Sequence, residues 1–310
     1  MDEWRPGQSV TLRVPASSAN LGPGFDSVGL ALGVWDRCRA TVLGSHGLEI
    51  TVAGEGAGAV PTDSTHLVYR SLVHAFEDLG EEAPTGLRFE CENAVPHGRG
   101  LGSSATAIVT GIAVAHALRA VRDGRAAGDI DLDAVNNLAA RLEGHPDNSS
   151  ASVYGGVTLS WSDDPAAGTT TLRLAPHDDL VPVVFTPSTQ LSTATARSVL
   201  PAQVRLADAA ANSARAALLV HALTCAPEHL LDGTREWLHQ EPRRPSYPAS
   251  MALVDTLRAA GHAAVVSGAG PSVLVLATTA TAGEVSGSAG DEWRVLLPGI
   301  PEHGVHAEAT

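Results

Sequence analysis

The sequence places its most flexible residues directly before a long apolar run, HGRGLGSSATAIVTGIAVAHAL. Gly98, Gly100 and Gly102 permit tight turns and expose consecutive backbone N–H groups, and Ser103 and Ser104 then stand where the apolar helix begins. The first turn of a helix carries unpaired N–H donors and about half a positive charge, which suits phosphate. We therefore predict an anion site at this turn. The alternative is a tight strand-to-helix turn in which a serine caps the helix.

A second glycine turn, SGAGPSV, contains Gly268 and Gly270 and lies between two apolar strand-like runs. By itself such a turn is typical of a β-hairpin. Together with the first glycine loop, it would bring a second stretch of backbone to the same site. The sequence leaves both interpretations open.

The stretch LEGHPDNSSA gathers polar side chains at the end of a predicted helix. Glu143 lies in the last helical turn, where an exposed carboxylate opposes the helix dipole at a cost of about 0.3–1 kcal/mol. A bound cation offsets that cost, and Mg²⁺ held by one or two protein oxygens and nucleotide phosphates fits. The alternative is a solvated surface glutamate. His145, Asp147 and Asn148 follow on a loop that Pro146 restricts, and we assign this HPDN segment to substrate contacts or to loop geometry.

Two acidic or amide residues and two arginines are candidates for holding a small polar substrate. Asn20 and Asp26 lie in the loop SSANLGPGFDSVG, and we expect Asp26 to face an ammonium group. Arg197 and Arg243 can supply a bidentate grip on a carboxylate. The alternatives are an ordinary Gly/Pro turn for the first pair and surface positions for the arginines.

Composition excludes several enzyme classes. All 20 basic residues are arginines, so the lysine that P-loop NTPases, protein kinases and pyridoxal-phosphate enzymes require is absent. The net charge of -14 argues against nucleic acid or an anionic membrane as the partner.

The start MDEWRPGQSV lacks the pattern of a signal peptide, and we expect no membrane span. Three widely spaced cysteines suit reduced thiols, so we expect a cytoplasmic protein.

Periodicity predicts strands and helices in clusters rather than in strict alternation, which favours an α+β fold. Asp63 or Ser64 is expected to cap the first helix, and Gly144 to end the third. The first half is expected to contain strands at 9–14, 38–43, 48–53, 87–93 and in GGVTLSW, and helices at 64–79, 105–118 and 132–143. The second half is expected to contain strands in LVPVVFTP, AAVVSGAG and SVLVLAT, helices near 202–223 and 248–260, a turn at 163–170 and a surface loop within 277–290.

These segments together resemble the GHMP kinases, and within them the homoserine kinase family. The matching motifs are VPASSANLGPGFDSVGLAL, HGRGLGSSAT, LEGHPDNSSASVYGG, LSTATARSVLP, LHQEPRRPSYP and SGAGPSVLV, in order from near residue 10 to about 276. The resemblance implies two domains, 1–165 like a ribosomal-protein S5 domain 2 and 166–310 a ferredoxin-like α+β domain. It also implies phosphorylation of L-homoserine by ATP in threonine biosynthesis, with Mg²⁺ as cofactor. A homodimer is left open.

The resemblance also implies roles for individual residues. The ATP phosphates would be wrapped by Pro96, His97, Gly98, Arg99, Gly100, Leu101, Gly102, Ser103, Ser104, Ala105 and Thr106. Mg²⁺ would be held by Ser104 and Glu143, and catalysis would involve these two with Thr193 and Arg197. The substrate would be held by Asn20, Asp26, His145, Asn148, Arg197, Arg243, Gly268 and Gly270.

The chain departs from the family pattern at two places. Pro242 stands where relatives have a tyrosine, and Arg244 follows Arg243, so either arginine could reach the substrate. The five-residue spacing to Pro248 favours Arg243. The family's DNVAPA is here DNSSAS, which makes that helix start more polar.

No acidic residue aligns as a general base, so we expect the substrate hydroxyl to lose its proton late to a phosphate oxygen. Two alternatives remain: a kinase for another small alcohol, or a relative that binds a nucleotide without catalysis.

Overall fold

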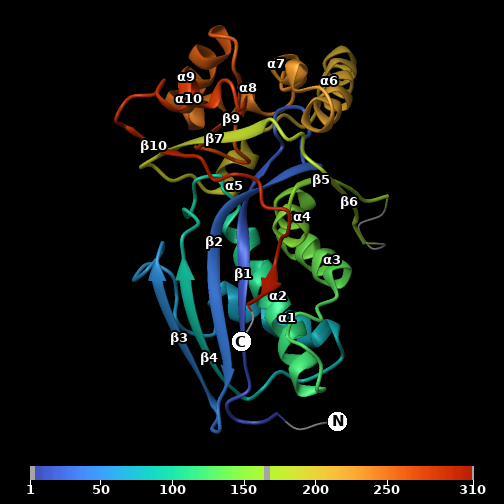
Figure 1. Cartoon of the computed structure of the whole chain (residues 1–310), viewed down its shortest axis with the longest axis vertical. Coiled ribbons are helices and arrows are strands. Elements are labelled where there is room, and N and C mark those ends of the chain that lie inside the picture. Colours follow the sequence, from blue (N-terminus) through green and yellow to red (C-terminus); the bar gives the residue numbers. More distant parts are fainter. Residues whose placement is uncertain (1–3, 164–167, 309–310) are drawn as a thin grey trace.

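The computed structural model describes residues 4–163 and 168–308. Two sheets lie one above the other in Figure 1, and each carries its own helices. The mixture of an antiparallel four-stranded sheet, a larger mixed sheet and flanking helices confirms the α+β prediction. The predicted turn at 163–170 falls partly outside the described residues.

The first sheet has seven strands among the described residues. Its order is β11-β1-β2-β4-β3, and β5 pairs with both β2 and β6. Its strands are β1 (Ser9–Ala19), β2 (Val28–Val42), β3 (Gly47–Gly54), β4 (Gly86–Asn93), β5 (Val157–Trp161), β6 (Thr170–Leu174) and β11 (His306–Ala307). Among the described strands of this sheet, only β3 and β4 pair in parallel, and all other neighbours are antiparallel.

The helices α1 (Leu67–Asp78), α2 (Ser103–Arg122), α3 (Leu132–Glu143) and α4 (Pro146–Tyr154) belong to the first sheet. The predicted bounds of α3 are confirmed: the Asp131 side chain accepts a hydrogen bond from the Ala134 N–H, and Gly144 ends the helix at φ +85°. The predicted cap of α1 is wrong. Asp63 closes a turn with Thr65 instead, so α1 begins only after His66.

Helix α2 is the buried helix that the apolar run predicted. Most of its residues are buried, because it lies between the sheet and the helices α1, α3 and α4. It is also long and apolar enough to cross a membrane, but 78% of its most apolar window is buried inside the protein. Its hydrophobicity is thus explained by its position in the core.

The second sheet has the antiparallel order β10-β7-β9-β8. Its strands are β7 (Leu180–Pro187), β8 (Ala263–Val266), β9 (Val273–Thr278) and β10 (Trp293–Leu296). Its helices are α5 (Thr193–Ser198), α6 (Leu206–Thr224), α7 (Leu230–Gly233), α8 (Gln240–Arg243), α9 (Pro248–Ala259) and α10 (Ala282–Ser286). The short helix α10 lies in the stretch that we expected to hold a surface loop.

The sheets do not divide at residue 165, because both ends of the second half return to the first sheet. Strand β6 pairs with β5, and β11 pairs with β1 close to the end of the chain. Strands β6, β10 and β11 were not predicted, and β1 and β2 are longer than predicted. An apolar cluster joins the two layers. It includes Leu30 on β2 and Leu101 in the loop before α2, with Val184 and Leu274 from the second sheet.

Candidate active site

The glycine loop leaves the first turn of α2 without a cap. Gly102 precedes the helix in the left-handed conformation, at φ +71°, and no side chain accepts a hydrogen bond from the helix start. Within the described ranges, the backbone N–H groups of residues 98–105 donate no hydrogen bond to the protein. The serine cap, one of the two structures that the sequence allowed, therefore does not form. The unpaired donors and the positive end of the helix dipole are available to an anion.

Close contacts with other segments require two of the loop glycines. A Cβ atom on Gly100 would lie 2.2 Å from the Ser267 carbonyl oxygen, and one on Gly102 would lie 2.2 Å from Ser17 Oγ. Ser267 Oγ also donates a hydrogen bond of 2.6 Å to the Gly100 carbonyl. The second glycine turn connects the antiparallel strands β8 and β9 as a hairpin, and it also contacts the first glycine loop. The hairpin and the shared site, which the sequence left as alternatives, are therefore compatible.

Both glycine turns open into a polar cleft of about 160 Å³ between the two sheets. From the predicted phosphate loop, the cleft is lined by Gly98, Gly100, Gly102, Ser103 and Ser104. All predicted substrate and metal residues line it too: Asn20, Asp26, Glu143, His145, Asn148, Arg197, Arg243, Gly268 and Gly270, together with Thr193. Residues from six separate segments, all named from the sequence as one site, therefore line a single cleft.

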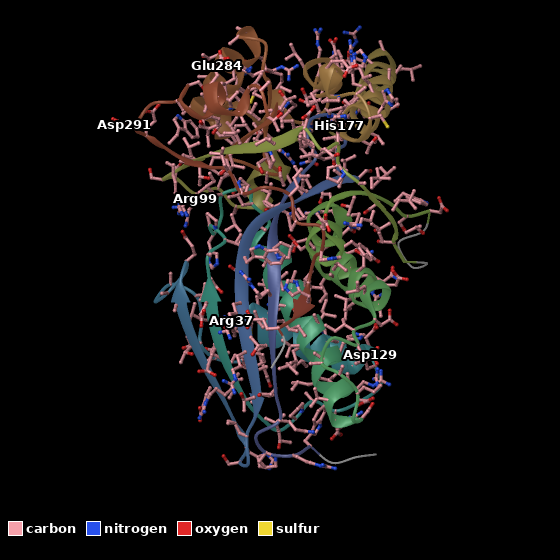
Figure 2. The ribbon with its side chains drawn as sticks, in the orientation of Figure 1. Arg37, Arg99, Asp129, His177, Glu284 and Asp291 are labelled. Atoms are coloured by element: carbon pink, nitrogen blue, oxygen red, sulfur yellow. The ribbon has the colours of Figure 1, made fainter. Side chains whose placement is uncertain are left out.

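Other members of the predicted loop have different positions. Pro96, Leu101, Ala105 and Thr106 are buried in the core. Arg99, labelled in Figure 2, lies next to the second sheet. Its guanidinium donates hydrogen bonds of 2.9 Å to the carbonyls of Pro187 and Ser188. These side chains hold the loop in place and leave its backbone facing the cleft.

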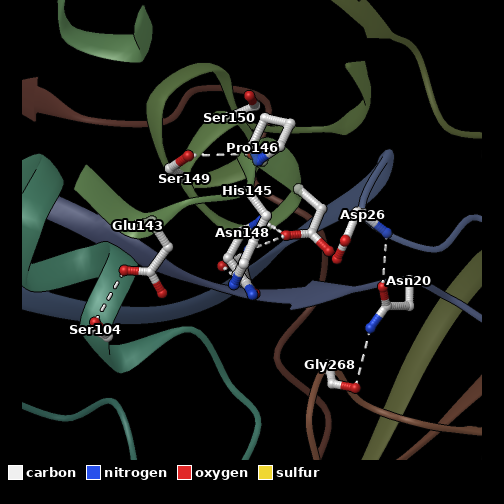
Figure 3. Close-up of polar contacts among 12 residues, drawn as sticks. Asn20, Asp26, Ser104, Glu143, His145, Pro146, Asn148, Ser149, Ser150 and Gly268 are labelled. Atoms are coloured by element: carbon white, nitrogen blue, oxygen red, sulfur yellow. Dashed lines mark hydrogen bonds and ion pairs between the residues drawn. The ribbon is translucent and has the colours of Figure 1, made fainter. Parts of the chain in front are cut away.

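Ser104 and Glu143 meet at one wall of the polar cleft (Figure 3). Ser104 Oγ donates a hydrogen bond of 3.0 Å to Glu143 Oε2, although the residues lie on different helices. Burial raises the pKa of Glu143 above its ordinary value, and the hydrogen bond from Ser104 opposes that rise. A hydroxyl and a carboxylate oxygen at this separation are the kind of hard donors that Mg²⁺ prefers.

His145 is held by the carboxylate of Asp147. Its Nδ1 lies 2.8 Å from Asp147 Oδ1, which also accepts the Asn148 N–H at 2.9 Å. Burial disfavours the charged ring, but the hydrogen bond and charge of Asp147 outweigh it and raise the pKa of His145. The sequence assigned Asp147, with the rest of HPDN, to substrate contacts or to loop geometry, but its spacing did not distinguish it from an ordinary loop acid. In the structure Asp147 is buried, and its carboxylate orients the His145 ring.

Asn20 uses both ends of its side chain within the protein. Its Oδ1 accepts the Asp26 N–H at 3.0 Å, and its Nδ2 donates to the Gly268 carbonyl at 3.1 Å (Figure 3). Asn20 and Asp26 both have left-handed backbone conformations, with φ of +69° and +55°. Asn20 thus ties the first loop to the second glycine turn and fixes where Asp26 points.

Asp26 and Arg197 face each other in the cleft. The Arg197 guanidinium donates two hydrogen bonds to the Asp26 carboxylate, at 2.5 and 3.2 Å. Arg197 comes from α5, which Ser192 caps by accepting the Thr195 N–H at 3.1 Å. The predicted ammonium partner and one predicted carboxylate partner therefore pair with each other in this structure.

Arg243 and Arg244 have opposite environments. Arg243 is 2% exposed, lines the cleft and donates from Nε to the Ala196 carbonyl at 3.0 Å. Burial lowers the pKa of its guanidinium. Arg244 lies outside the cleft, where it pairs with Glu241 and Asp255. Of the two candidates, only Arg243 lies where it can contact a ligand in the cleft.

A second, mostly apolar space adjoins the polar cleft at Ser103 and Ser104, and we call it the side cavity. It measures about 270 Å³, and its lining includes Asp36, Cys38, Val60, His66, Cys91 and His97. His66 is 6% exposed, and its Nδ1 has no hydrogen-bond partner among the described residues. Sequence reasoning missed this cavity, because its lining comes from several separate strands, helices and loops, and only His97, Ser103 and Ser104 belong to a motif.

Besides Ser104 and Glu143, three other side chains in the cleft have the spacing of a metal site. Ligand atoms of Asp26, His145 and Asp147 lie within 4.8 Å of one another. Asp26 already pairs with Arg197, and Asp147 with His145, so these carboxylates balance positive groups of the protein. Ser104 and Glu143 therefore remain the predicted Mg²⁺ ligands.

Family models match both halves of the chain. The N-terminal domain model of the GHMP kinases matches residues 66–156, and the C-terminal model matches residues 214–294. Similar curated proteins include the homoserine kinase of Streptomyces avermitilis, 52% identical over 92% of this chain and 91% of that protein. The homoserine kinase of Rhodococcus erythropolis is 45% identical over 98% of this chain and 97% of that protein.

Solved structures agree with the fold. A homoserine kinase crystal structure from Cytophaga hutchinsonii superposes with a TM-score of 0.84, and the match covers 99% of this chain and all of that one. At 24% identity, this likeness speaks for the fold alone.

Proposed function

The chain belongs to the GHMP kinases and, within them, to the homoserine kinase family, and we propose that it holds ATP and L-homoserine in the polar cleft and side cavity. The family's reaction transfers the γ-phosphoryl group of ATP to the side-chain hydroxyl of L-homoserine, in threonine biosynthesis. The single observation that carries the proposal is the uncapped start of α2, whose N–H groups face the cleft.

The phosphates of ATP would lie against the backbone of residues 98–105. This segment offers unpaired N–H groups at the positive end of a 20-residue helix. Such donors stabilise negative charge without a lysine, which the chain lacks. They also need no reorganisation, because Gly100 and Gly102 are fixed by contacts with Ser267 and Ser17.

The nucleoside would occupy the side cavity, because this space begins at Ser103 and Ser104, beside the proposed phosphate site. Its apolar walls suit a base, and the unpartnered Nδ1 of His66 offers a hydrogen-bond partner at depth. Burial lowers the pKa of His66, which keeps the ring neutral. A neutral ring can donate or accept according to its tautomer.

Mg²⁺ would be held by Ser104 and Glu143 with the phosphates. The two side chains fit, since both supply oxygen atoms, both line the cleft, and Glu143 Oε2 lies 3.0 Å from Ser104 Oγ. When bound, the ion would neutralise part of the charge on the triphosphate.

L-homoserine is a zwitterion, and the cleft presents both complementary charges. We assign its ammonium group to Asp26 and its carboxylate to Arg197 and Arg243, with His145, Asn148 and Thr193 around the hydroxyl end. Asp26 and Arg197 would then exchange their mutual pair for contacts with the substrate. That exchange keeps each charge paired both before and after binding, which avoids the cost of a lone desolvated charge.

The carboxylates in the cleft all have partners, which leaves none free as a general base. Asp26 pairs with Arg197, Asp147 with His145, and Glu143 accepts from Ser104. We infer that the substrate hydroxyl loses its proton late, to a phosphate oxygen. The pH profile of Asp147→Asn tests this inference: its shape should match that of the unmodified enzyme, and the loss of one limb would contradict it.

The direct test is ADP release with homoserine, serine, threonine and mevalonate as acceptors. We expect the highest kcat/KM with L-homoserine. Faster turnover of another alcohol would favour a different small-alcohol kinase, and no turnover with tight ADP binding would favour a non-catalytic relative. The cytoplasmic location and a homodimer stay predictions.

A further inference from the structure

Two cysteines face each other in the wall of the side cavity. Cys38 on β2 and Cys91 on β4 are register partners in the antiparallel pairing of these strands. Their Sγ atoms lie 3.7 Å apart. Both side chains are buried, with exposed fractions of 3% and 4%. The third cysteine, Cys225, is exposed and lies on the other half of the chain.

The strand pairing places the two residues within reach of a disulfide. Directly opposed residues of antiparallel strands have Cα atoms about 4.5 or 5.5 Å apart. Disulfides span Cα distances of about 4.4–6.8 Å, and their S–S bond measures about 2.05 Å. The thiols can therefore be joined by rotation of the two side chains, while the strands keep their register.

The side cavity gives a small molecule access to both thiols. Cys38 and Cys91 belong to its lining, and its volume of about 270 Å³ exceeds the roughly 30 Å³ that a water molecule occupies in the liquid. The contact with Cys91 and burial raise the pKa of the Cys38 thiol. The thiolate is the reactive form, so the pair should react slowly and only with an oxidant small enough to enter.

The pair also connects to the phosphate loop. Asp36 precedes Cys38 by two residues, and its Oδ1 accepts the N–H groups of Ala94 and Val95 at 2.7 and 2.9 Å. Ala94 and Val95 follow Cys91 and lead directly into the glycine loop. A bond between the two sulfur atoms would therefore change the wall of the side cavity beside both ends of the anchor that positions this loop.

We propose that a small hydroperoxide entering the side cavity converts Cys38 and Cys91 into a reversible disulfide, and that this bond weakens nucleotide binding. The two thiols lose two electrons and two protons, one S–S bond forms, and hydrogen peroxide is reduced to two molecules of water. A dithiol reductant reverses the step by exchange. The second half of the proposal rests on the proposed function, because it needs the nucleoside in the side cavity.

The test uses full-length protein with Cys225→Ser, which removes the exposed thiol and leaves only the pair. The reduced protein is incubated with hydrogen peroxide, with and without saturating ADP, and is then analysed by intact mass and non-reducing peptide mapping. ADP and homoserine affinities are measured by calorimetry before oxidation, after it, and after reduction with dithiothreitol. Cys38→Ser and Cys91→Ser, each in the same background, are the matched controls.

We expect a mass loss of two hydrogens, a peptide linking Cys38 to Cys91, slower formation in the presence of ADP, and several-fold weaker ADP binding that dithiothreitol restores. Neither control variant should form the link or lose affinity in this way. Addition of oxygen to the protein without a cross-link, or intact thiols after the peroxide treatment, would contradict the proposal that a disulfide forms. A disulfide that left ADP affinity unchanged would overturn its effect on the nucleotide. Reduced protein that bound no ADP would instead contradict the proposed function, and the thiol pair would then be judged by mass and peptide map alone.

Discussion

Asp26 and Arg197 lie 171 positions apart in the sequence and form a bidentate ion pair in the polar cleft. Each is about one-third exposed, so the pair is open to a ligand from the cleft side. Asp26 is fixed by its backbone hydrogen bond to Asn20, whereas Arg197 lies on the short helix α5. The arrangement favours a ligand that carries both charges, because such a ligand can replace each partner with its own group.

Asp26→Asn should weaken homoserine binding. Hydrogen bonds to charged groups contribute about 1.5–3 kcal/mol, so we expect the apparent KM for homoserine to rise by about 10- to 150-fold. The KM for ATP should stay nearly constant. Steady-state kinetics measures both constants. The control is Asp255→Asn, because Asp255 pairs with Arg244 at the surface and lies outside the cleft. An equal rise in both KM values would contradict the assignment of Asp26 to the ammonium group.

Arg243→Ala and Arg244→Ala form a matched pair. Arg243 is buried at the cleft and Arg244 forms exposed ion pairs, which contribute about 0–1 kcal/mol. We expect Arg243→Ala to raise the KM for homoserine more than it lowers kcat, and Arg244→Ala to leave both within about twofold. Urea unfolding of both variants separates loss of binding from loss of folding. A larger KM effect from Arg244→Ala would reverse the assignment.

Glu143→Gln should lower kcat more than it raises the KM for homoserine, because the change removes a metal ligand and leaves the substrate contacts.

The pKa of Glu143 is raised, so its carboxylate takes up a proton at a higher pH than an ordinary glutamate does. Metal binding requires the charged form, and Mg²⁺-dependent ADP affinity should therefore fall as the pH falls through the raised pKa. Calorimetry with and without Mg²⁺ checks this. The variant should lose the Mg²⁺ effect, and the exposed control Glu77→Gln should keep it.

Gly100→Ala tests whether the loop depends on close packing as well as on its backbone conformation. Gly124 has a similar φ, +75° against +73°, but a Cβ atom on Gly124 would meet no neighbour within 4 Å. Gly124→Ala should therefore cost only the left-handed strain of about 1–2 kcal/mol and leave activity intact. Gly100→Ala should cost more and also lower kcat/KM for ATP, since Ser267 must move. Urea unfolding and steady-state kinetics measure the two effects, and equal losses would remove the packing argument.

Asp36 makes stability depend on pH in the direction opposite to most acids. Burial raises its pKa from 3.8 to about 6, so the folded protein binds this proton more tightly than the unfolded chain does. The contribution is favourable below the unfolded pKa and is lost as the pH rises through about 6. Relative to Asp36→Asn, the unmodified protein should lose about 1–2 kcal/mol of unfolding free energy between roughly pH 5 and 7.5. Urea unfolding of both proteins at the two pH values measures it, and a constant difference would contradict the shift.

Local patterns determined several elements of the fold. The stripe and terminal glycine of α3 predicted its bounds, and the continuous apolar run predicted the buried α2. The same reasoning failed for β11, because two residues carry no periodicity and this strand exists only through its pairing with β1. The same reasoning predicted too short a strand for β2, because the first residues of β2 pair with β5, a partner more than 100 positions away.

Type and spacing in the sequence predicted the candidate residues: the glycine loop, the acid at the end of α3 and the arginines in two later segments. The structure places them around one cleft, and their roles stay predictions. Only the tertiary structure decided between Arg243 and Arg244, because neighbours of the same type differ solely in what packs around them. It alone also paired Asp26 with Arg197, left the start of α2 without a cap and brought Cys38 to Cys91. Such relations depend on contacts between distant segments, which local propensity does not encode.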